Sequence, residues 1–211
     1  FIKQVLAPAL HHRGVYLTAT AIGKPGHKGG IRSYESTRRE ILAVLKQDQQ
    51  RFCTTMFDYY GLPGGWPNKA TATGSPSAMA NYIEQAMLQD VCSIMDEPST
   101  SSRFIPYIQM HEYEALLFSE PATLASVVQR SFLTGTFLNI VTECGEPEAI
   151  DDRPDTAPSK RIKNHVREYN KVIHGTITAQ RIGLPKMRER CPHFSEWISR
   201  LEKLGETESA E

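Results

Sequence analysis

The first half of the chain alternates between helix-like and strand-like patterns of apolar residues. Residues 1–10 place apolar side chains near helical spacing, and the β-branched run at residues 15–22 predicts a strand. Residues 34–49 carry apolar side chains on one face and charged side chains on the other, which predicts an amphipathic helix. The apolar run at residues 52–58 predicts a buried strand, because a loop rich in glycine and proline ends it.

A helix followed by a second apolar run completes a strand–helix–strand pattern. Ser75 before Pro76 marks the start of the helix, because the serine oxygen can cap free amide groups and proline loses no hydrogen bond at the first helical position. The helix should end near residue 92. Residues 103–110 predict the next strand, with an edge position or a bulge at Pro106. This order predicts parallel strands joined by a right-handed crossover.

The second half of the chain has a helical pattern throughout. We expect helices near residues 112–118, 121–130, 134–142, 158–167, 176–190 and 193–204. The expected fold class is therefore α/β, with a small, mainly parallel sheet flanked by helices and a helical C-terminal half. We expect an α/β core over residues 1–118, a helical part packed on it over residues 119–204, and a disordered acidic tail over residues 205–211.

Composition limits the class of protein. The 211 residues are enough for a domain with a hydrophobic core, and the four cysteines lack the CxxC spacing of metal or redox motifs, which favours a reducing compartment. No apolar run approaches the roughly 18 to 20 residues that cross a bilayer, and no secretory signal opens the chain. We therefore expect a cytoplasmic protein that does not contact a membrane.

Acidic and basic residues are equal in number, 24 of each, but they are unevenly distributed. Residues 112–152 contain eight acidic residues and one basic residue, whereas residues 153–203 contain twelve basic and five acidic residues. The balanced total gives no general case for nucleic acid. The basic segment could still bind a nucleic-acid backbone or the acidic segment before it.

Acidic residues follow both predicted strands at their carboxyl ends. Because parallel strands end at the same edge of a sheet, where open α/β sheets bind ligands, we expect Asp58 and His111 at that edge. Asp58, Glu112 and Glu114 could bind Mg²⁺ or Mn²⁺, and His111 would add tolerance for softer metals. Two structural roles stay open. Asp58 could cap a turn, and one of the glutamates could face the positive end of a helix dipole.

A glycine-rich loop, GKPGHKGGIR, carries several basic side chains. Lys24, Lys28 and Arg32 could present positive charge, and the glycines free amide groups, to a phosphate. The loop is not a P-loop, because the Gly-Lys-Ser/Thr order is absent. A solvated turn is the alternative.

Basic side chains also occupy the start of a predicted helix in the second half. Lys160 and Arg161 follow Thr156-Ala157-Pro158, so they lie at a helix N-terminus, where the macrodipole disfavours positive charge. Lys171, in YNKVIHG, extends this basic face. Binding to nucleic acid or phosphate is one interpretation, and an ordinary solvated face is the other.

Aromatic residues surround Asp58 in the loop that follows the first apolar strand. Tyr59, Tyr60 and Trp66 could stack on bases, but aromatic residues in a loop rich in proline and glycine more often anchor the loop to the core. We therefore expect anchors.

Seven stretches of the sequence carry a family resemblance over about residues 6–204. They are RGVYL, GGIRSYE, TTMFDYYGLP, RFIPYIQMHEYEALLF, DTAPSKRI, YNKVIHG and RIGLPKMRERCPHFSEWISRLE. Together they resemble the bacterial domain-of-unknown-function family numbered 4276, which is considered similar to Toprim-like domains. That fold, found in topoisomerases, primases and defence nucleases, holds Mg²⁺ on a leading glutamate and on acids after a later strand.

The resemblance implies roles for particular residues. Asp58 matches the later acid, whereas Tyr60 stands where a second aspartate is usual, so Glu112 or Glu114 could substitute. The leading phrase, similar to Glu-Gly-x-Thr-Glu, is absent from this sequence.

The resemblance implies a Mg²⁺-dependent phosphodiester hydrolase of the phage-defence type. Asp58, Glu112 and Glu114 would hold the metal directly or through water, and Lys160 would stabilise charge on the phosphate. Two alternatives stay open. One is a non-catalytic Toprim-like module that binds a partner such as an ATPase encoded nearby, and the other is a hydrolase of a phosphorylated small molecule.

Overall fold

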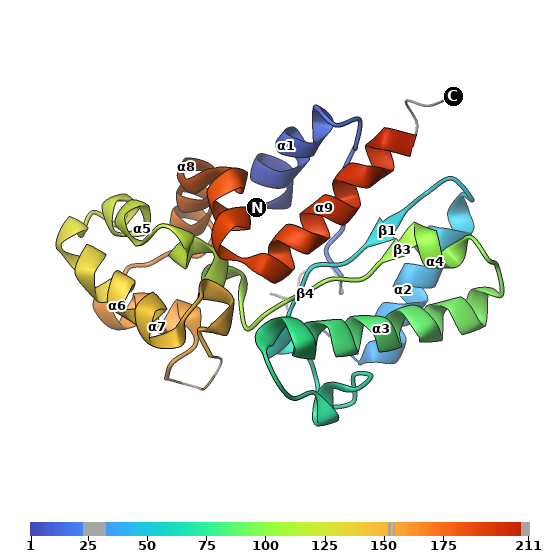
Figure 1. Ribbon diagram of the computed structural model, residues 1–211, viewed down its shortest axis with the longest axis horizontal. Helices are drawn as coiled ribbons and strands as arrows, with labels where there is room; N and C mark the ends of the chain where they lie inside the picture. The colour runs from blue at the N-terminus through green and yellow to red at the C-terminus, as the bar shows by residue number, and fades with distance from the viewer. Residues whose placement is uncertain (23–32, 152, 154, 208–211) are drawn as a thin grey trace. The chain divides into compact units, whose positions relative to one another are not determined.

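Helices form most of the structure, and the strands are short and parallel (Figure 1). The computed structural model describes residues 1–22, 33–151, 153 and 155–207. The chain divides into a strand unit, Thr20–Met110, and a helical unit, Phe1–Ala19 with His111–Glu211. We expected the division at residue 118, with the opening residues in the α/β core; here those residues belong with the C-terminal helices. The mixed α/β class is confirmed.

Two pairs of parallel strands lie in the described part of the strand unit. β1 (Cys53–Thr54) pairs with β3 (Phe104–Ile105), and β2 (Phe57–Asp58) pairs with β4 (Ile108–Gln109). α3 (Pro76–Met95) lies between the two predicted strands in the chain, so the strand–helix–strand order and the parallel pairing are confirmed. The remaining elements are α2 (Tyr34–Gln47), η2 (Tyr59–Gly61), η3 (Lys69–Thr71) and α4 (Thr100–Arg103).

Each of the two predicted strands has a gap in its middle. Pro106 separates β3 from β4, because proline has no N–H to offer a neighbouring strand. Thr55 lies in the matching gap of the other strand. Its Oγ1 donates to the Tyr107 carbonyl at 3.0 Å and accepts from the Tyr107 N–H at 2.9 Å. One hydroxyl group therefore takes the place of two backbone hydrogen bonds. The strands keep the same register on both sides of the gap, so Pro106 interrupts the pairing and does not form the bulge that was one of the two predicted possibilities.

Serine residues begin both long helices of the strand unit. Ser75 Oγ accepts from the Ala78 N–H at 3.3 Å, with Pro76 at the first helical position, as predicted. Ser33 Oγ accepts from the Ser36 N–H at 3.4 Å at the start of α2.

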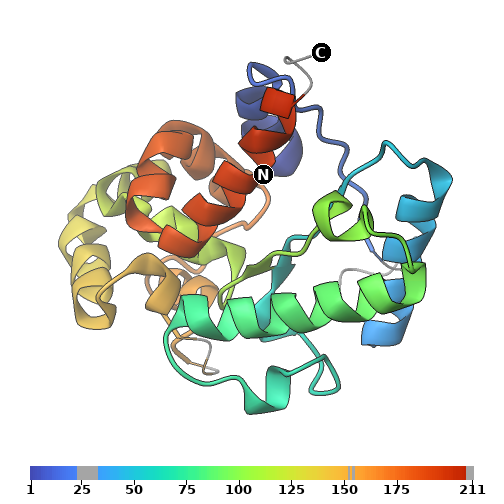
Figure 2. The same cartoon turned by 45° about the vertical axis from the view of Figure 1, so that its right-hand side comes forward.

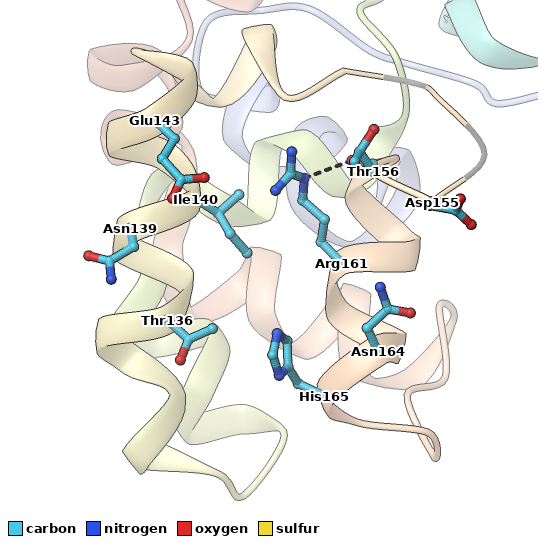
Figure 3. Close-up of a pocket in the computed structure, with 9 residues that line it drawn as sticks. All are labelled: Thr136, Asn139, Ile140, Glu143, Asp155, Thr156, Arg161, Asn164 and His165. Carbon is cyan, nitrogen blue, oxygen red and sulfur yellow. Dashed lines mark hydrogen bonds between the residues drawn. The ribbon is translucent and has the colours of Figure 1, made fainter.

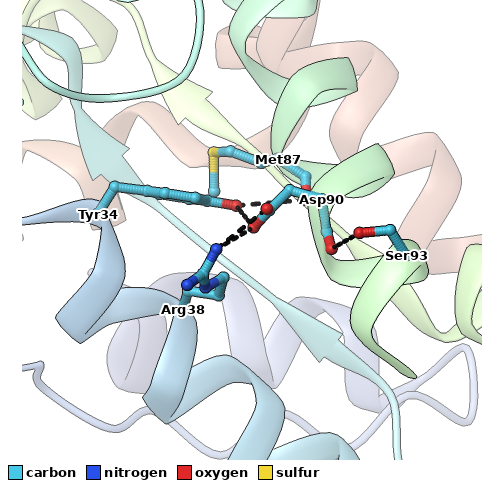
Figure 4. Close-up of polar contacts among 5 residues, drawn as sticks. All are labelled: Tyr34, Arg38, Met87, Asp90 and Ser93. Carbon is cyan, nitrogen blue, oxygen red and sulfur yellow. Dashed lines mark hydrogen bonds and ion pairs between the residues drawn. The ribbon is translucent and has the colours of Figure 1, made fainter. Parts of the chain in front are cut away.

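A polar contact joins α2 to α3 (Figure 4). Arg38 Nη1 donates to both carboxylate oxygens of Asp90, at 3.0 and 3.2 Å, and the Tyr34 hydroxyl donates to Asp90 Oδ2 at 2.8 Å. Burial and the Asp90 charge raise the pKa of Tyr34. Because Arg38 and Asp90 are both about 30% exposed (29% and 30%), the ion pair orients the two helices and contributes little stability, about 1 kcal/mol or less.

The helical unit is built around an apolar 3₁₀ segment. Residues 115–118, in η4 (Tyr113–Ser119), are all fully buried, and η4 packs against α5, α6, α7 and α8. The other elements are η1 (Ile2–Leu6), α1 (Ala7–His11), α5 (Pro121–Val127), η5 (Ser131–Leu133), α6 (Thr134–Cys144), η6 (Pro147–Ala149), α7 (Pro158–His165), α8 (Ile173–Arg190) and α9 (Pro192–Thr207). The helical second half is confirmed. No described helix is both long and apolar enough to cross a membrane.

Two local predictions are wrong. Residues 15–22 form no strand: they have no strand partner among the described residues, and Tyr16 is 74% exposed. Residues 205–207, expected in a disordered tail, are the last residues of α9, which runs beside α1 in Figures 1 and 2. Gly205 lies against Arg13, where a Cβ atom would fall 1.6 Å from the Arg13 carbonyl oxygen, so only glycine allows this approach. Residues 208–211 lie outside the described residues.

Candidate functional site

Asp58 lies at the carboxyl end of β2, in register with Gln109 of the parallel strand β4. It is half-buried, and it is the residue before the 3₁₀ turn η2. Its side chain makes no capping hydrogen bond to that turn, so the capping role left open from the sequence is not the one it has. The sequence thus located a carboxylate at the carboxyl end of a strand in a parallel pair.

The loop after Asp58 is anchored by aromatic and basic side chains. Trp66 is 2% exposed, and its ring packs edge-on against Phe57 and Tyr34, each at 5.4 Å between centroids, which confirms the anchor interpretation for this residue. Lys69 Nζ donates to the carbonyls of Tyr59 and Leu62 and lies 4.9 Å from the Tyr59 ring centre. Lys69 was not predicted to have this role, because nothing in the local sequence of a polar loop marks one lysine as the one that folds back onto the backbone.

His111 has a left-handed backbone conformation, with φ at 61°. It lies two residues after the end of β4 and is 8% exposed. Histidine tolerates this region better than β-branched residues do, but the conformation is uncommon for any residue other than glycine. Non-glycine residues in such conformations cluster at functional sites, so the backbone of His111 is consistent with a functional role for residues 111–114.

Glu112 caps a helix by accepting from an amide 47 residues later in the chain. Its Oε2 accepts from the Ser159 N–H at 2.9 Å, at the start of α7, where the cap residue Ala157 has no side-chain acceptor of its own. From the sequence, one of the two glutamates could face the positive end of a helix dipole. Glu112 has this role, and the helix concerned is α7. The carboxylate also offsets the unfavourable positions of Lys160 and Arg161 in the first turn of this helix.

Glu114 is fully buried and pairs with a lysine from a distant loop. Its Oε2 lies 2.8 Å from Lys171 Nζ, and the Lys171 side chain is 47% exposed. Burial, and then the negative charge of Glu114, raise the pKa of the Tyr113 and Tyr169 phenols. The Tyr113 hydroxyl donates to the Gly175 carbonyl at 3.1 Å. Lys171, predicted to bind phosphate, is thus a partner of Glu114.

Two further buried glutamates bind backbone amides, and the sequence analysis missed both. Glu148 is fully buried and accepts from the His193 N–H at 2.9 Å and from the Phe194 N–H at 3.0 Å, at the start of α9. Glu84, on α3, accepts from the Ile108 N–H at 2.7 Å. Neither is detectable from local sequence, because each partner lies more than 20 residues away in the chain.

The predicted basic residues are in different situations. Lys160 is exposed on α7, and Arg161 is half-buried, with its Nε donating to the Thr156 carbonyl at 2.8 Å. Lys24, Lys28 and Arg32 lie outside the described residues.

The helical unit brings Glu114 to Lys171 and places Tyr113 and Tyr169 together beside Gly175. Asp58 lies in the strand unit. Among the described residues, no group of three or more His, Cys, Asp or Glu side chains is arranged to hold a metal ion. The metal-ligand roles of Asp58, His111, Glu112 and Glu114 therefore remain predictions.

Comparison with known proteins agrees with the family resemblance. A family model described as "Domain of unknown function (DUF4276)" matches residues 1–202. No curated protein and no solved structure matches the chain. Because the family match covers nearly all of the sequence, the chain belongs to the DUF4276 family of domains of unknown function.

Proposed function

We propose that this protein is a Mg²⁺- or Mn²⁺-dependent phosphodiester hydrolase with a Toprim-like centre at Asp58, of the type used in bacterial phage defence. The observation that carries the proposal is the position of Asp58 at the carboxyl end of β2, in a parallel strand pair. Open α/β sheets bind their ligands at this edge. A half-buried carboxylate at the end of a strand is a ligand type that suits a hard divalent cation.

The other predicted residues have supporting roles in this proposal. The metal would polarise the phosphate and lower the pKa of a bound water, and Lys160 would offset charge on the phosphate. Glu112 and Glu114 would act on the metal through water, because one already accepts the Ser159 amide and the other already contacts Lys171. Lys24, Lys28 and Arg32 would contribute phosphate binding.

The first test is metal binding and cleavage in Asp58→Asn beside a matched control. Asp96→Asn is that control, because Asp96 is exposed in the same unit and has a φ of 51°, which asparagine also adopts. Calorimetric titration with Mn²⁺, followed by cleavage of labelled DNA and RNA, should give saturable binding and activity in the wild type and in Asp96→Asn. Asp58→Asn should lose both. Equal cleavage by all three proteins would rule the proposal out.

The Glu112→Gln variant distinguishes a catalytic role of Glu112 from its structural role as the cap of α7. The glutamine oxygen can still accept from the Ser159 amide, so α7 should keep its cap while the negative charge is lost. We expect a normal melting temperature and at least a tenfold loss of metal-dependent cleavage, which corresponds to about 1.4 kcal/mol. Unchanged cleavage would restrict Glu112 to its structural role.

One observation favours a second function, a non-catalytic module that binds a partner such as an ATPase. Three apolar side chains are exposed at the start of α8: Val172 at 77%, Ile173 at 56% and Ile177 at 37%. Exposed apolar groups this close together are typical of protein interfaces. Replacement of Val172 and Ile173 by serine should abolish co-purification with an ATPase encoded nearby, whereas Leu138→Ser, at another exposed apolar position, should not.

A further inference from the structure

A polar groove lies between α6 and α7 in the helical unit (Figure 3). It has a volume of about 430 Å³, within the range of sites that bind small molecules. Side chains on α6 form one wall, and side chains on α7 and the turn before it form the other. None of the predicted metal ligands lines it, so the groove is separate from the proposed catalytic residues.

Arg161 is the basic side chain best placed in the groove. Its Nε donates to the Thr156 carbonyl at 2.8 Å, which fixes the plane of the guanidinium group (Figure 3). Thr156 is held in turn, because its hydroxyl donates to Asp151, which also accepts from Arg153 Nε at 2.8 Å. Among the described residues, the Thr156 carbonyl is the one hydrogen-bond acceptor of Arg161, so its terminal nitrogens can serve a ligand. A fixed guanidinium group suits a phosphate, which it can bind through two parallel hydrogen bonds.

The rest of the lining is neutral and can recognise a planar ring. Asn164 on α7 is an exposed amide, and an amide can pair with the donor and acceptor on the edge of a base. The Asn139 amide on α6 points away from α7 (Figure 3). The His165 ring packs edge-on against Phe137, at 6.2 Å between centroids, which restricts its rotation. Ile140 adds an apolar surface between these groups.

Two carboxylates in the lining restrict the charge of the ligand. Glu143 on α6 and Asp155 on the turn add negative charge near the single guanidinium group, so a nucleic-acid strand with many phosphates would be repelled more strongly than a ligand with one. Carboxylates do accept hydrogen bonds from ribose hydroxyl groups in nucleotide sites. A ligand with one phosphate, a hydroxylated sugar and a planar base matches Arg161, Glu143 and Asn164.

We propose that the groove between α6 and α7 binds a nucleoside monophosphate. Arg161 holds the phosphate, Glu143 accepts from the ribose hydroxyl groups, and Asn164 contacts the base. This site does not depend on the phosphodiesterase proposal, and no metal takes part in it.

The test is calorimetric titration of AMP, GMP, CMP and UMP into the Asp58→Asn protein in the presence of EDTA, so that loss of metal chemistry cannot affect the result. We expect saturable binding of at least one nucleotide, with inorganic phosphate and the matching nucleoside each at least tenfold weaker. Arg161→Gln should weaken binding at least tenfold and Arg161→Lys by less, because lysine keeps the charge and loses the paired geometry. Arg167→Gln, an exposed position just beyond α7, is the matched control and should bind normally.

Asn164→Ala keeps the test informative if the Arg161 variants fold poorly. Asn164 is exposed, so its removal should leave the melting temperature unchanged and weaken nucleotide binding about fivefold. Absence of saturable binding by any of the four nucleotides would overturn the proposal. So would equal binding of inorganic phosphate, or unchanged affinity in well-folded Arg161→Gln and Asn164→Ala.

Discussion

The acidic residues of the two units differ in how deeply they are buried. In the strand unit, Asp58 is half-buried at the carboxyl end of β2. In the helical unit, Glu112, Glu114 and Glu148 are 8%, 0% and 0% exposed, and each binds a backbone amide or a lysine. The deeper burial makes these contacts necessary, because a carboxylate removed from water needs hydrogen bonds or a counter-charge. Glu84 supports this explanation, since it is buried in the strand unit and binds the Ile108 amide.

The largest effect should be a pH dependence of stability from Glu148. Burial raises the pKa of Glu148 from 4.5 to about 7, although the charge of His193 and the amides of His193 and Phe194 oppose the shift. Between these values the folded protein keeps a proton that the unfolded chain has lost. The free energy of unfolding should therefore fall as pH rises from about 5 to about 7, by about 2 to 3 kcal/mol. Urea unfolding across this range measures the slope, which Glu148→Gln should flatten. An equal slope in both proteins would assign it to other groups.

Removal of Lys171 should have the next largest effect. Lys171→Met leaves the Glu114 carboxylate buried without its lysine. We expect the free energy of unfolding at pH 8 to fall by about 2 kcal/mol, less than for a fully buried pair because Lys171 is half-exposed. Adding Glu114→Gln should restore part of the loss. Lys163→Met, which removes an exposed charge on α7, is the control, and an equal loss in that variant would contradict the importance of the pair.

Loss of the α7 cap should have a smaller effect. Glu112→Ala leaves the Ser159 N–H without its carboxylate and exposes Lys160 and Arg161 to the unopposed helix dipole. We expect a loss of about 1 kcal/mol in chemical denaturation, typical of a helix cap. Glu196→Ala, at an exposed position on α9, should change stability by less than about 0.5 kcal/mol. A stable Glu112→Ala protein would mean that α7 does not need the cap.

Asp58→Asn should have the smallest effect on stability. The change keeps the size of a half-buried side chain and one oxygen that can accept hydrogen bonds, so the free energy of unfolding should change by less than about 0.5 kcal/mol. Metal-dependent cleavage, in contrast, should be lost. A large destabilisation would mean that Asp58 has a structural role, as the buried glutamates of the helical unit do.

The sequence predicted the regular elements well, because their signals are local. Ser75 and Pro76 marked the start of α3, and the helical periodicity after residue 112 located the C-terminal helices. The wrong predictions concern segments whose structure depends on contacts with residues far away in the chain. Residues 15–22 have a strand-like composition but no strand to pair with among the described residues. Gly205 looked like part of a polar tail, and its contact with Arg13 is visible only in the folded unit.

In the candidate site, too, some features could be predicted from local sequence and others depend on contacts between distant residues. The sequence by itself identified the acids and the strand end at which Asp58 lies, because residue type and periodicity are properties of the chain. Only the tertiary structure decided which carboxylates are engaged: Glu112 with the Ser159 amide, and Glu114 with Lys171. Each of these partners lies more than 40 residues away in the chain. A buried charge needs a counter-charge or hydrogen bonds, and the packing of the folded chain determines which residue supplies them. The spacing of residues along the sequence does not identify that residue.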